Sequence, residues 1–329
     1  AKIYIMKTLV ILAVFAVAAT LFLSYSGSNS EFDQFVATYQ KSYNSADEYE
    51  LRKSIFESNL KMIAEHNAGS HSYTLEINQF GDLTLEEFKK RLGYKRTRPQ
   101  PVIENNGQTV PKSDVTIDWE AKGVVSPVKN QGSCGSCWAF SAVGALEAAH
   151  AIAGNGQVQE FAEQQLVDCD TSKCQGCNGG EMFYAFAFYQ ENGACFEKSY
   201  PYKARDQKCQ QASCTNDSKK ISNFVLIEKN DPSLLHENLQ IAPHSLGVEA
   251  GNSVWQFYKK GVVDDARRCG SDLDHGVLLA GYDADLDAWK VKNSWGPNWG
   301  VKGYIYIKDN HKVSPGVCGV NMEISRPVL

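Results

Sequence analysis

The fold is decided by a run of ten residues, Gln131-Gly132-Ser133-Cys134-Gly135-Ser136-Cys137-Trp138-Ala139-Phe140. Apolar residues then recur at helical spacing (Phe140, Val143, Leu146, Ile152) until Gly154-Asn155-Gly156 ends the pattern, which predicts a helix that begins at Cys137. A thiol at a helix N-terminus faces unpaired backbone N–H groups and the positive end of the helix dipole, and both stabilise its thiolate. We therefore predict that Cys137 is a nucleophile; the alternative is that it forms half of a disulfide.

Two later stretches supply partners for a thiolate. His275, in Leu273-Asp274-His275-Gly276-Val277, begins an apolar run that predicts a strand, far enough downstream for a Cys–His pair built from two parts of the fold. Asn293, in Lys292-Asn293-Ser294-Trp295-Gly296, can accept the other imidazole N–H and so orient the ring, although an Asn-Ser pair alone is a turn signal. An indole from Trp295 or Trp299 would shield this contact from water. The side-chain amide of Gln131, together with the Cys137 N–H, would form an oxyanion hole.

With these residues the chain resembles the papain-like cysteine proteases, and in particular the cathepsin L-like precursors, nearly end to end. The resemblance implies an α+β, papain-like two-lobe fold, with a helical left lobe and an antiparallel β-barrel-like right lobe behind a helical inhibitory prodomain. The order of patterns agrees with this fold class. Helical patterns dominate up to about Ile221, and short strand-like runs follow at 224–227, 276–280, 289–291 and 304–307.

A predicted helix from about Ala46 to Asn67 carries the prosegment part of the resemblance. One of its faces holds six residues at intervals of four, four, three, four and four: Glu48, Arg52, Phe56, Asn59, Ile63 and Asn67. Any single helix can have such a mixed face, but the six match the interwoven motif of cathepsin L-like zymogens without a gap, with Glu48 and Arg52 spaced to pair. The residues Asn78, Phe80 and Asp82 resemble the second prosegment motif of this family, although Glu76 stands where the family usually has glycine.

Three segments follow from these patterns. Residues 1–27 are expected to be a secretory signal peptide with a short upstream extension, because residues 8–23 are uncharged and mostly aliphatic; a membrane anchor is the alternative. Residues 28–112 would be the inhibitory propeptide and 113–329 the mature peptidase domain. The stretch from Tyr94 to Ser113 has three prolines, Asn105-Asn106-Gly107 and no hydrophobic period, which predicts an exposed linker.

Charge and cysteine content narrow the function classes. A net charge of −5 gives no basic footprint for nucleic acid. Ten cysteines behind a signal peptide fit an exported protein that forms disulfides. Two CxxC pairs, beginning at Cys134 and Cys174, could instead mark a zinc site, but the first opens a helix, so we expect no metal and no cofactor.

The resemblance also implies a disulfide pattern. It suggests the pairs Cys134–Cys177, Cys169–Cys209 and Cys269–Cys318, and Cys195–Cys214 as a fourth bridge found in some protozoan relatives. This pairing leaves Cys174 unpaired and open to exposure at the surface. The rival pairing joins Cys174 to Cys214 and leaves Cys195 as a buried thiol.

Substrate contacts are likewise implied by motif position. The backbone of Gly179 and Gly180 would pair with an extended substrate, since glycine permits close approach. The pocket for the second residue before the scissile bond (the S2 pocket) would be lined by Met182, Gly247, Leu273, Gly276 and Glu323, with Asp274 and Trp295 bordering the site. Glu323 stands where cathepsin L-like enzymes usually have a small residue, so we expect this pocket to accept Arg as well as Leu or Phe.

We therefore expect a cysteine endopeptidase made as an inactive precursor and released in acid, when carboxylates such as Glu48 and Asp82 become protonated. Nothing in the sequence resembles the paired-histidine insertion of the cathepsin B-like exopeptidases. The expected partners are protein and peptide substrates, the chain's own propeptide and cystatin-type inhibitors. We expect the enzyme to be a monomer that works in a lysosome-like acidic compartment or outside the cell. Asn216-Asp217-Ser218 is a candidate glycosylation site. The alternatives are a catalytically inactive relative used for binding, and a secreted inhibitor built on the prosegment fold.

Overall fold

The computed structural model describes residues 30–97, 115–214, 219–227, 230, 232–310 and 315–329. The expected signal peptide, most of the expected linker and Asn216 lie outside these ranges. The chain forms two compact units, Ala1–Ser58 and Asn59–Leu329, which are treated separately below.

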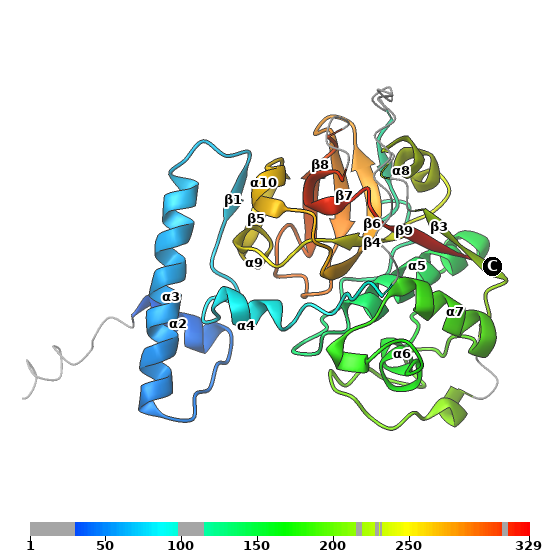
Figure 1. The fold of residues 1–329 in the computed structure, drawn as a ribbon, viewed down its shortest axis with the longest axis horizontal. Coiled ribbons are helices and arrows are strands. Elements are labelled where there is room, and N and C mark those ends of the chain that lie inside the picture. Colours follow the sequence, from blue (N-terminus) through cyan, green and yellow to red (C-terminus); the bar gives the residue numbers. More distant parts are fainter. Residues whose placement is uncertain (1–29, 98–114, 215–218, 228–229, 231, 311–314) are drawn as a thin grey trace, which may run out of the picture. The chain divides into compact units, whose positions relative to one another are not determined.

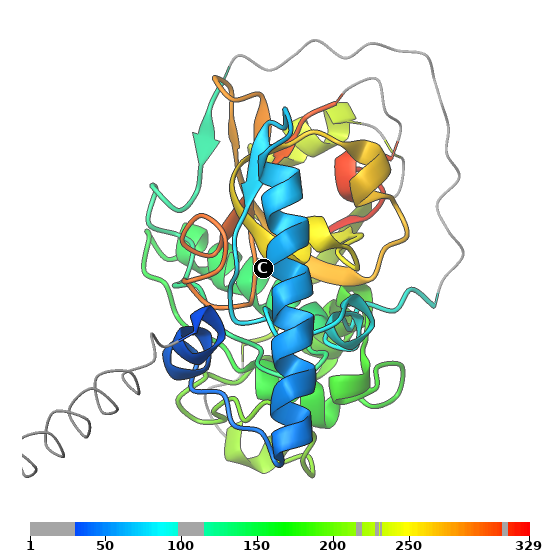
Figure 2. The same cartoon turned by 90° about the vertical axis from the view of Figure 1, so that its left-hand side faces the viewer.

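The described part of the first unit consists of α2 (Glu31–Thr38) and the N-terminal half of α3 (Ala46–Asn67). Ser30 caps α2 in a reciprocal pair of hydrogen bonds with Asp33, which satisfies N–H groups that a helix start leaves open. The ring of Phe56 lies 5.3 Å from that of Phe32 and 4.9 Å from that of Phe35, so these aromatics form the core of the unit. Helix α3 is one unbroken helix (Figure 2), and its bounds are those that the sequence predicts.

The second unit is built on a mixed sheet whose strands run in the order β1-β5-β8-β7-β6-β4-β9-β3, with β2 paired to β6 (Figure 1). The strands are β1 (Tyr73–Leu75), β2 (Ile117–Asp118), β3 (Asn223–Ile227), β4 (His244–Val248), β5 (Tyr258–Val263), β6 (His275–Asp283), β7 (Ala288–Lys292), β8 (Tyr304–Lys308) and β9 (Ile324–Val328). The pairings are antiparallel except β5 with β8, which is parallel and departs from the expected antiparallel lobe. Eight of the nine β6 residues are buried, because both faces of this strand are covered.

The helices of this unit lie on several sides of the sheet, and those between residues 137 and 192 are grouped together (Figure 1). The helices are α4 (Leu85–Lys89), α5 (Cys137–Ala153), α6 (Glu163–Cys169), α7 (Met182–Asn192), α8 (Pro232–Leu239), α9 (Ser253–Phe257) and α10 (Ala266–Cys269), with short 3-10 turns at Gly176–Asn178, Gln211–Cys214 and Val317–Gly319. Thirteen of the 17 residues of α5 are buried, as expected for a helix that is apolar almost all round. Helix α5 packs against β4, β6 and β9 and so joins the helical part to the sheet.

Residues that precede the mature part contribute to the second unit. Strand β1 extends the sheet beyond β5, and Asn59 donates from its side chain to the carbonyls of Gly81 and Leu83. Asn78 donates to the carbonyl of Gln256 at 2.8 Å. At the start of the expected linker, Lys95 and Thr97 are exposed as predicted, whereas Tyr94 and Arg96 are not. Tyr94 is 4% exposed, because residues 93–97 lie against both α5 and the sheet side of the unit.

Candidate active site

Cys137 is the first residue of α5, and its side chain is fully buried. Its sulfur accepts the backbone N–H of Gly93 at 3.2 Å and a further N–H from Gly276. Burial raises the pKa of the Cys137 thiol to about 11, although these N–H groups oppose the shift. In this covered form the sulfur is therefore held as a neutral thiol.

His275 is the first residue of β6 and lies beside Asn293, which directly follows β7. The His275 Nε2 atom is 2.8 Å from Asn293 Oδ1. The N–H of Ser294 also donates to Oδ1 at 2.8 Å, which identifies this atom as the amide oxygen. Nε2 therefore carries the hydrogen, and Nδ1 is the basic nitrogen. Burial lowers the pKa of the His275 imidazole to about 4, so the ring is neutral as long as the site is covered.

Trp295 stacks on His275, with ring centroids 4.7 Å apart and planes 27° from parallel. The indole is 2% exposed, so it keeps water away from one face of the imidazole. Phe80 and Phe88 contact its rings edge-on, and Gln79 donates to its carbonyl at 2.6 Å. The residues around the second prosegment motif thus cover the tryptophan that covers the histidine.

Gln131 is fully buried beside the N-terminus of α5. Its Nε2 donates to the carbonyl of Arg91 at 3.0 Å and to that of Cys134 at 2.9 Å. Its Oε1 accepts the hydroxyl of Ser294 at 2.7 Å, which fixes the direction of the amide. The backbone carbonyl of Arg91, in the prosegment, therefore accepts a hydrogen bond from the Gln131 amide, which we expected to donate to an oxyanion.

The approach of α5 to β6 depends on Gly276. A Cβ added there would lie 3.1 Å from both the carbonyl oxygen of Cys137 and the Cα of Trp138, tighter than nearly all real contacts. The glycine that follows His275 therefore lets β6 come close to the start of α5. This contact brings two residues that are 138 positions apart, Cys137 and His275, into one site (275 − 137 = 138).

Residues 93–97 bind the site as an extended strand. The N–H of Gly180 donates to the carbonyl of Gly93 at 2.8 Å, and the carbonyl of Gly180 accepts the N–H of Lys95 at 3.0 Å. These two hydrogen bonds form a parallel bridge between Gly180 and Tyr94. Tyr94 donates its N–H to the carbonyl of Asp274 at 3.1 Å. A Cβ at Gly93 would lie 1.7 Å from the carbonyl oxygen of Gly135, so only glycine can pass here.

The side chain of Tyr94 fills the expected S2 pocket. Its ring belongs to an apolar cluster that also includes Met182, Leu273 and Met322. A Cβ added at Gly247 would lie 3.5 Å from Tyr94 Cζ, so this backbone forms one wall. The hydroxyl of Tyr94 and the guanidinium of Arg96 both donate to Glu323, which is fully buried. Gly276, the fifth expected pocket residue, pairs with Gly247 in the sheet and also lies against Cys137.

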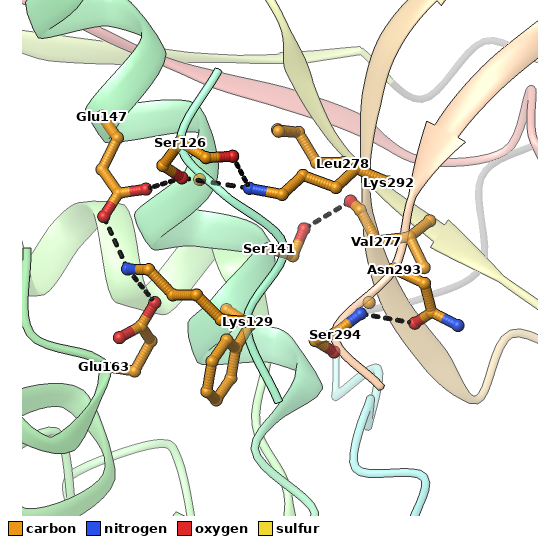
Figure 3. Close-up of a pocket in the computed structure, with 13 residues that line it drawn as sticks. Ser126, Lys129, Ser141, Glu147, Glu163, Val277, Leu278, Lys292, Asn293 and Ser294 are labelled. Atoms are coloured by element: carbon orange, nitrogen blue, oxygen red, sulfur yellow. Dashed lines mark hydrogen bonds and ion pairs between the residues drawn. The ribbon is translucent and has the colours of Figure 1, made fainter. Parts of the chain in front are cut away.

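A buried group of charges lies behind the site (Figure 3). Lys129 Nζ is 2.7 Å from Glu147 and 2.8 Å from Glu163, and Ser126 joins Glu147 to Lys292. These side chains line a cavity of about 20 Å³ that also touches Asn293 and Ser294, large enough for one water molecule. Sequence reasoning missed this group; the one available signal was a lysine, Lys292, directly before Asn293.

Tyr94 and Arg96 were also missed as site residues, because their surroundings have the composition of a linker. Their alternation was the usable signal, since residues two apart in an extended segment point to the same side. In the prosegment helix, Glu48 accepts the N–H and side-chain amide of Asn44, at 2.7 and 3.1 Å. Asn67 exchanges two hydrogen bonds with the backbone of Leu75, and Ile63 lies in the apolar core of the second unit.

Four disulfides join the expected pairs, Cys134–Cys177, Cys169–Cys209, Cys195–Cys214 and Cys269–Cys318. The rival pairing of Cys174 with Cys214 is therefore absent. Cys174 is a free thiol, but it is only 3% exposed rather than open to solvent. Cys134 and Cys177, one from each CxxC pair, are bonded to each other.

Comparisons with known proteins decide the family. The model of the papain family cysteine proteases matches residues 113–328, and that of the cathepsin propeptide inhibitor domain matches residues 32–88. The chain belongs to the papain family of cysteine proteases. It is a cathepsin L-like proenzyme whose propeptide acts as its own intramolecular inhibitor.

Relatives of this papain-family proenzyme match over most of their length. "Cysteine protease XCP2" of Arabidopsis thaliana is 42% identical over 90% of this chain and 85% of its own length. "Procathepsin L" of Rattus norvegicus is 39% identical over 92% of each chain. The solved structure of digestive procathepsin L 3 from Tenebrio molitor larval midgut is 35% identical, with a TM-score of 0.78, and covers 92% of this chain and 99% of that one. Among the described residues of the proenzyme, no helix is long and apolar enough to cross a membrane.

Proposed function

We propose that the activated enzyme is an endopeptidase in which Cys137 is the nucleophile, His275 the acid and base, Asn293 the positioning residue, and Gln131 an oxyanion donor. The observation that carries this proposal is the 2.8 Å contact between His275 Nε2 and Asn293 Oδ1 under Trp295, which leaves Nδ1 as the basic nitrogen. Covering of the site favours neutral Cys137 and neutral His275. When the prosegment leaves, solvent returns and a thiolate–imidazolium pair can form.

The reaction then proceeds in two halves. The thiolate of Cys137 attacks the peptide carbonyl carbon, and the oxygen gains negative charge beside the Gln131 amide. The imidazolium of His275 gives its proton to the leaving amine as the C–N bond breaks. Neutral His275 next takes a proton from water, which attacks the thioester and releases the acid and the thiol. No cofactor takes part in these steps.

The test uses the two thiols that are free in the structure. An epoxide or vinyl-sulfone probe should label the acid-activated enzyme once, and Cys137→Ala should abolish both labelling and peptide hydrolysis. Cys174→Ala is the matched control and should keep both. Normal labelling and hydrolysis by Cys137→Ala would reject the assignment, and an unlabelled, inactive parent would favour the rival function, a catalytically inactive binding protein.

We further propose that the S2 pocket accepts Arg as well as apolar residues. Support comes from Arg96, which donates to Glu323 while both side chains are at most 4% exposed. A carboxylate in that position matches a guanidinium in charge and geometry. Glu323→Ala should reduce cleavage of a peptide with Arg at the S2-facing position far more than cleavage of the same peptide with Leu at that position. An equal loss on both substrates would contradict the role of Glu323.

We also propose segment ends at residues 27 and 112, a monomeric enzyme in an acidic or extracellular compartment, and inhibition by cystatin-type proteins. Release of the propeptide in acid completes the proposal. The purified precursor should process itself at pH of about 4–5 and not at about 7.5. Processing only at the higher pH would contradict this mode of release.

A further inference from the structure

A tyrosine hydroxyl joins the two ends of the loop that leads into α5. This loop runs from Gln131, the proposed oxyanion donor, to Ser136, which directly precedes Cys137. The Tyr202 hydroxyl lies 2.8 Å from the backbone carbonyl oxygen of Gln131 and 2.6 Å from the hydroxyl of Ser136. Because a carbonyl only accepts hydrogen bonds, Tyr202 donates to Gln131 and accepts the hydrogen of Ser136. One phenol thus ties the start of the loop to its end.

The Ser136 side chain serves this bridge and not the helix that it precedes. A serine at the N-cap usually accepts a backbone N–H of the first turn. Ser136 is the N-cap of α5 and is fully buried, yet its side chain makes no capping hydrogen bond. The N–H of Trp138, which a capping serine can take, bonds to the Cys137 sulfur. An N–H that helps to stabilise a thiolate is therefore left to Cys137, and the Ser136 hydroxyl is left to Tyr202.

Tyr202 and Gln131 are both held by further contacts. The ring of Tyr202 packs edge-on against Phe140, in the first turn of α5, with ring centroids 4.8 Å apart. The backbone N–H of Tyr202 donates to Glu197 at 2.8 Å. The backbone N–H of Gln131 donates to the carbonyl of Ser294 at 2.8 Å. The Tyr202 hydroxyl thus has a fixed position, and its two hydrogen bonds set the distance between Gln131 and the start of α5.

We propose that Tyr202 is a positioning residue, whose hydroxyl holds the Gln131 amide and the Cys137 N–H at the spacing that binds an oxyanion. This inference rests on the proposed function, in which these two groups are the oxyanion donors. Donors that are in place before negative charge develops stabilise the transition state most, and loss of one such donor typically costs about 10²- to 10³-fold in kcat. A donor that is displaced and not removed costs part of that amount.

The decisive variant is Tyr202→Phe, which keeps the ring against Phe140 and removes the hydroxyl. In enzyme activated from the full-length precursor, kcat/KM for a peptide substrate should fall roughly 10- to 100-fold. Alkylation of Cys137 by iodoacetamide should stay within about threefold of wild type, at a pH where the thiolate is fully formed. In that reaction the sulfur forms a bond to a saturated carbon and iodide leaves, so no oxyanion develops.

Tyr200→Phe is the matched control. The Tyr200 hydroxyl also makes two hydrogen bonds, since it donates to Asp168 at 2.9 Å and accepts the N–H of Gln210 at 2.9 Å. This variant should lose a similar amount of thermal stability and keep kcat/KM within about threefold of wild type. Ser136→Ala removes the other end of the bridge and decides the question if Tyr202→Phe does not fold. It should lower kcat/KM by roughly 3- to 10-fold, again with little change in alkylation.

The double variant Tyr202→Phe/Gln131→Ala tests whether the two residues act together. Gln131→Ala alone should lower kcat/KM at least about 100-fold. Adding Tyr202→Phe should then cost less than about threefold more, because the donor whose position Tyr202 sets is gone.

The inference is wrong if Tyr202→Phe hydrolyses peptides at the wild-type rate, or if its loss recurs in full in the Gln131→Ala background. It is also wrong if alkylation falls in parallel with hydrolysis, because the hydroxyl would then support the whole site. If wild-type enzyme neither cleaves peptides nor reacts at Cys137, the proposed peptidase function fails instead.

Discussion

The buried charges behind the active site allow a quantitative test of how a buried ion pair contributes to the stability of the protein. Lys129 Nζ lies 2.7 Å from Glu147 and 2.8 Å from Glu163, and each glutamate side chain is 1% exposed. Glu163 Oε2 has no hydrogen-bond partner within the described residues, so the carboxylate depends on Lys129. The variant Lys129→Met keeps most of the stem and removes the charge.

The expected loss follows from leaving two buried carboxylates without their cation. Breaking a buried ion pair on one side typically costs about 3–5 kcal/mol. For a domain of this size, that loss lowers the melting temperature by about 10 °C. Lys61→Met is the matched control, because Lys61 is 79% exposed and its pair with Glu65, at 4.0 Å, is a surface pair that contributes little.

The loss should also depend on pH. Burial raises the pKa of Glu163, and the charge of Lys129 opposes that shift. Without Lys129 the carboxyl binds its proton more tightly in the folded state than in the unfolded state. A group with a raised folded pKa contributes stability that is lost as pH rises, so the variant should be weaker at pH 8 than at pH 5.

Thermal unfolding monitored by tryptophan fluorescence, in a Cys137→Ala precursor that cannot digest itself, measures both effects. The double variant Lys129→Met/Glu163→Gln should recover part of the loss at pH 8, because the stranded charge is gone. A melting temperature at pH 8 within about 2 °C of the parent would refute the reasoning. So would a larger loss at pH 5 than at pH 8.

Three further predictions concern the site and its cover. His66→Gln should shift acid processing of the precursor to lower pH. Arg268 donates to His66 Nδ1 at 3.1 Å, and burial lowers the pKa of the His66 ring. The folded precursor therefore loses stability as pH falls through this lowered pKa, because protonated His66 would repel Arg268. Asn293→Ala should lower kcat/KM roughly 10- to 100-fold without changing how much Cys137 the probe finally labels, since the histidine loses only its orientation. Gly93→Ala should weaken inhibition by the prosegment and raise activity of the unprocessed precursor at least about tenfold, because a Cβ would lie 1.7 Å from the Gly135 carbonyl oxygen.

Each of these has a clear contrary result. An unchanged pH profile in the His66 variant would remove that histidine from acid release. A wild-type rate for Asn293→Ala would show that the ring needs no positioning partner. A Gly93→Ala precursor that stays as silent as the parent would mean that residues 93–97 are not what blocks the site.

The sequence predicted those parts of the fold whose cause is local. Helix α3 runs from Ala46 to Asn67 as its spacing indicates, and α5 begins at Cys137 and ends before Gly154. The parallel pairing of β5 with β8 was not predicted, because strand partners are chosen by tertiary packing.

The missed site residues share a physical reason. Tyr94 and Arg96 both donate to Glu323, which is 229 and 227 positions away, so nothing in their own stretch of sequence signals burial. In the sequence Lys129 cannot be told from a surface lysine, because Glu147 and Glu163 come close to it only in the folded chain.

The most direct test of the central claim is the rate at which a thiol-directed epoxide modifies Cys137 in the activated enzyme, with the site located by peptide mapping. The account predicts one equivalent on Cys137 and at least about 100-fold slower labelling in His275→Ala, since the histidine is what makes the sulfur reactive. Equal rates in the two proteins, or a label that falls on Cys174, would contradict it.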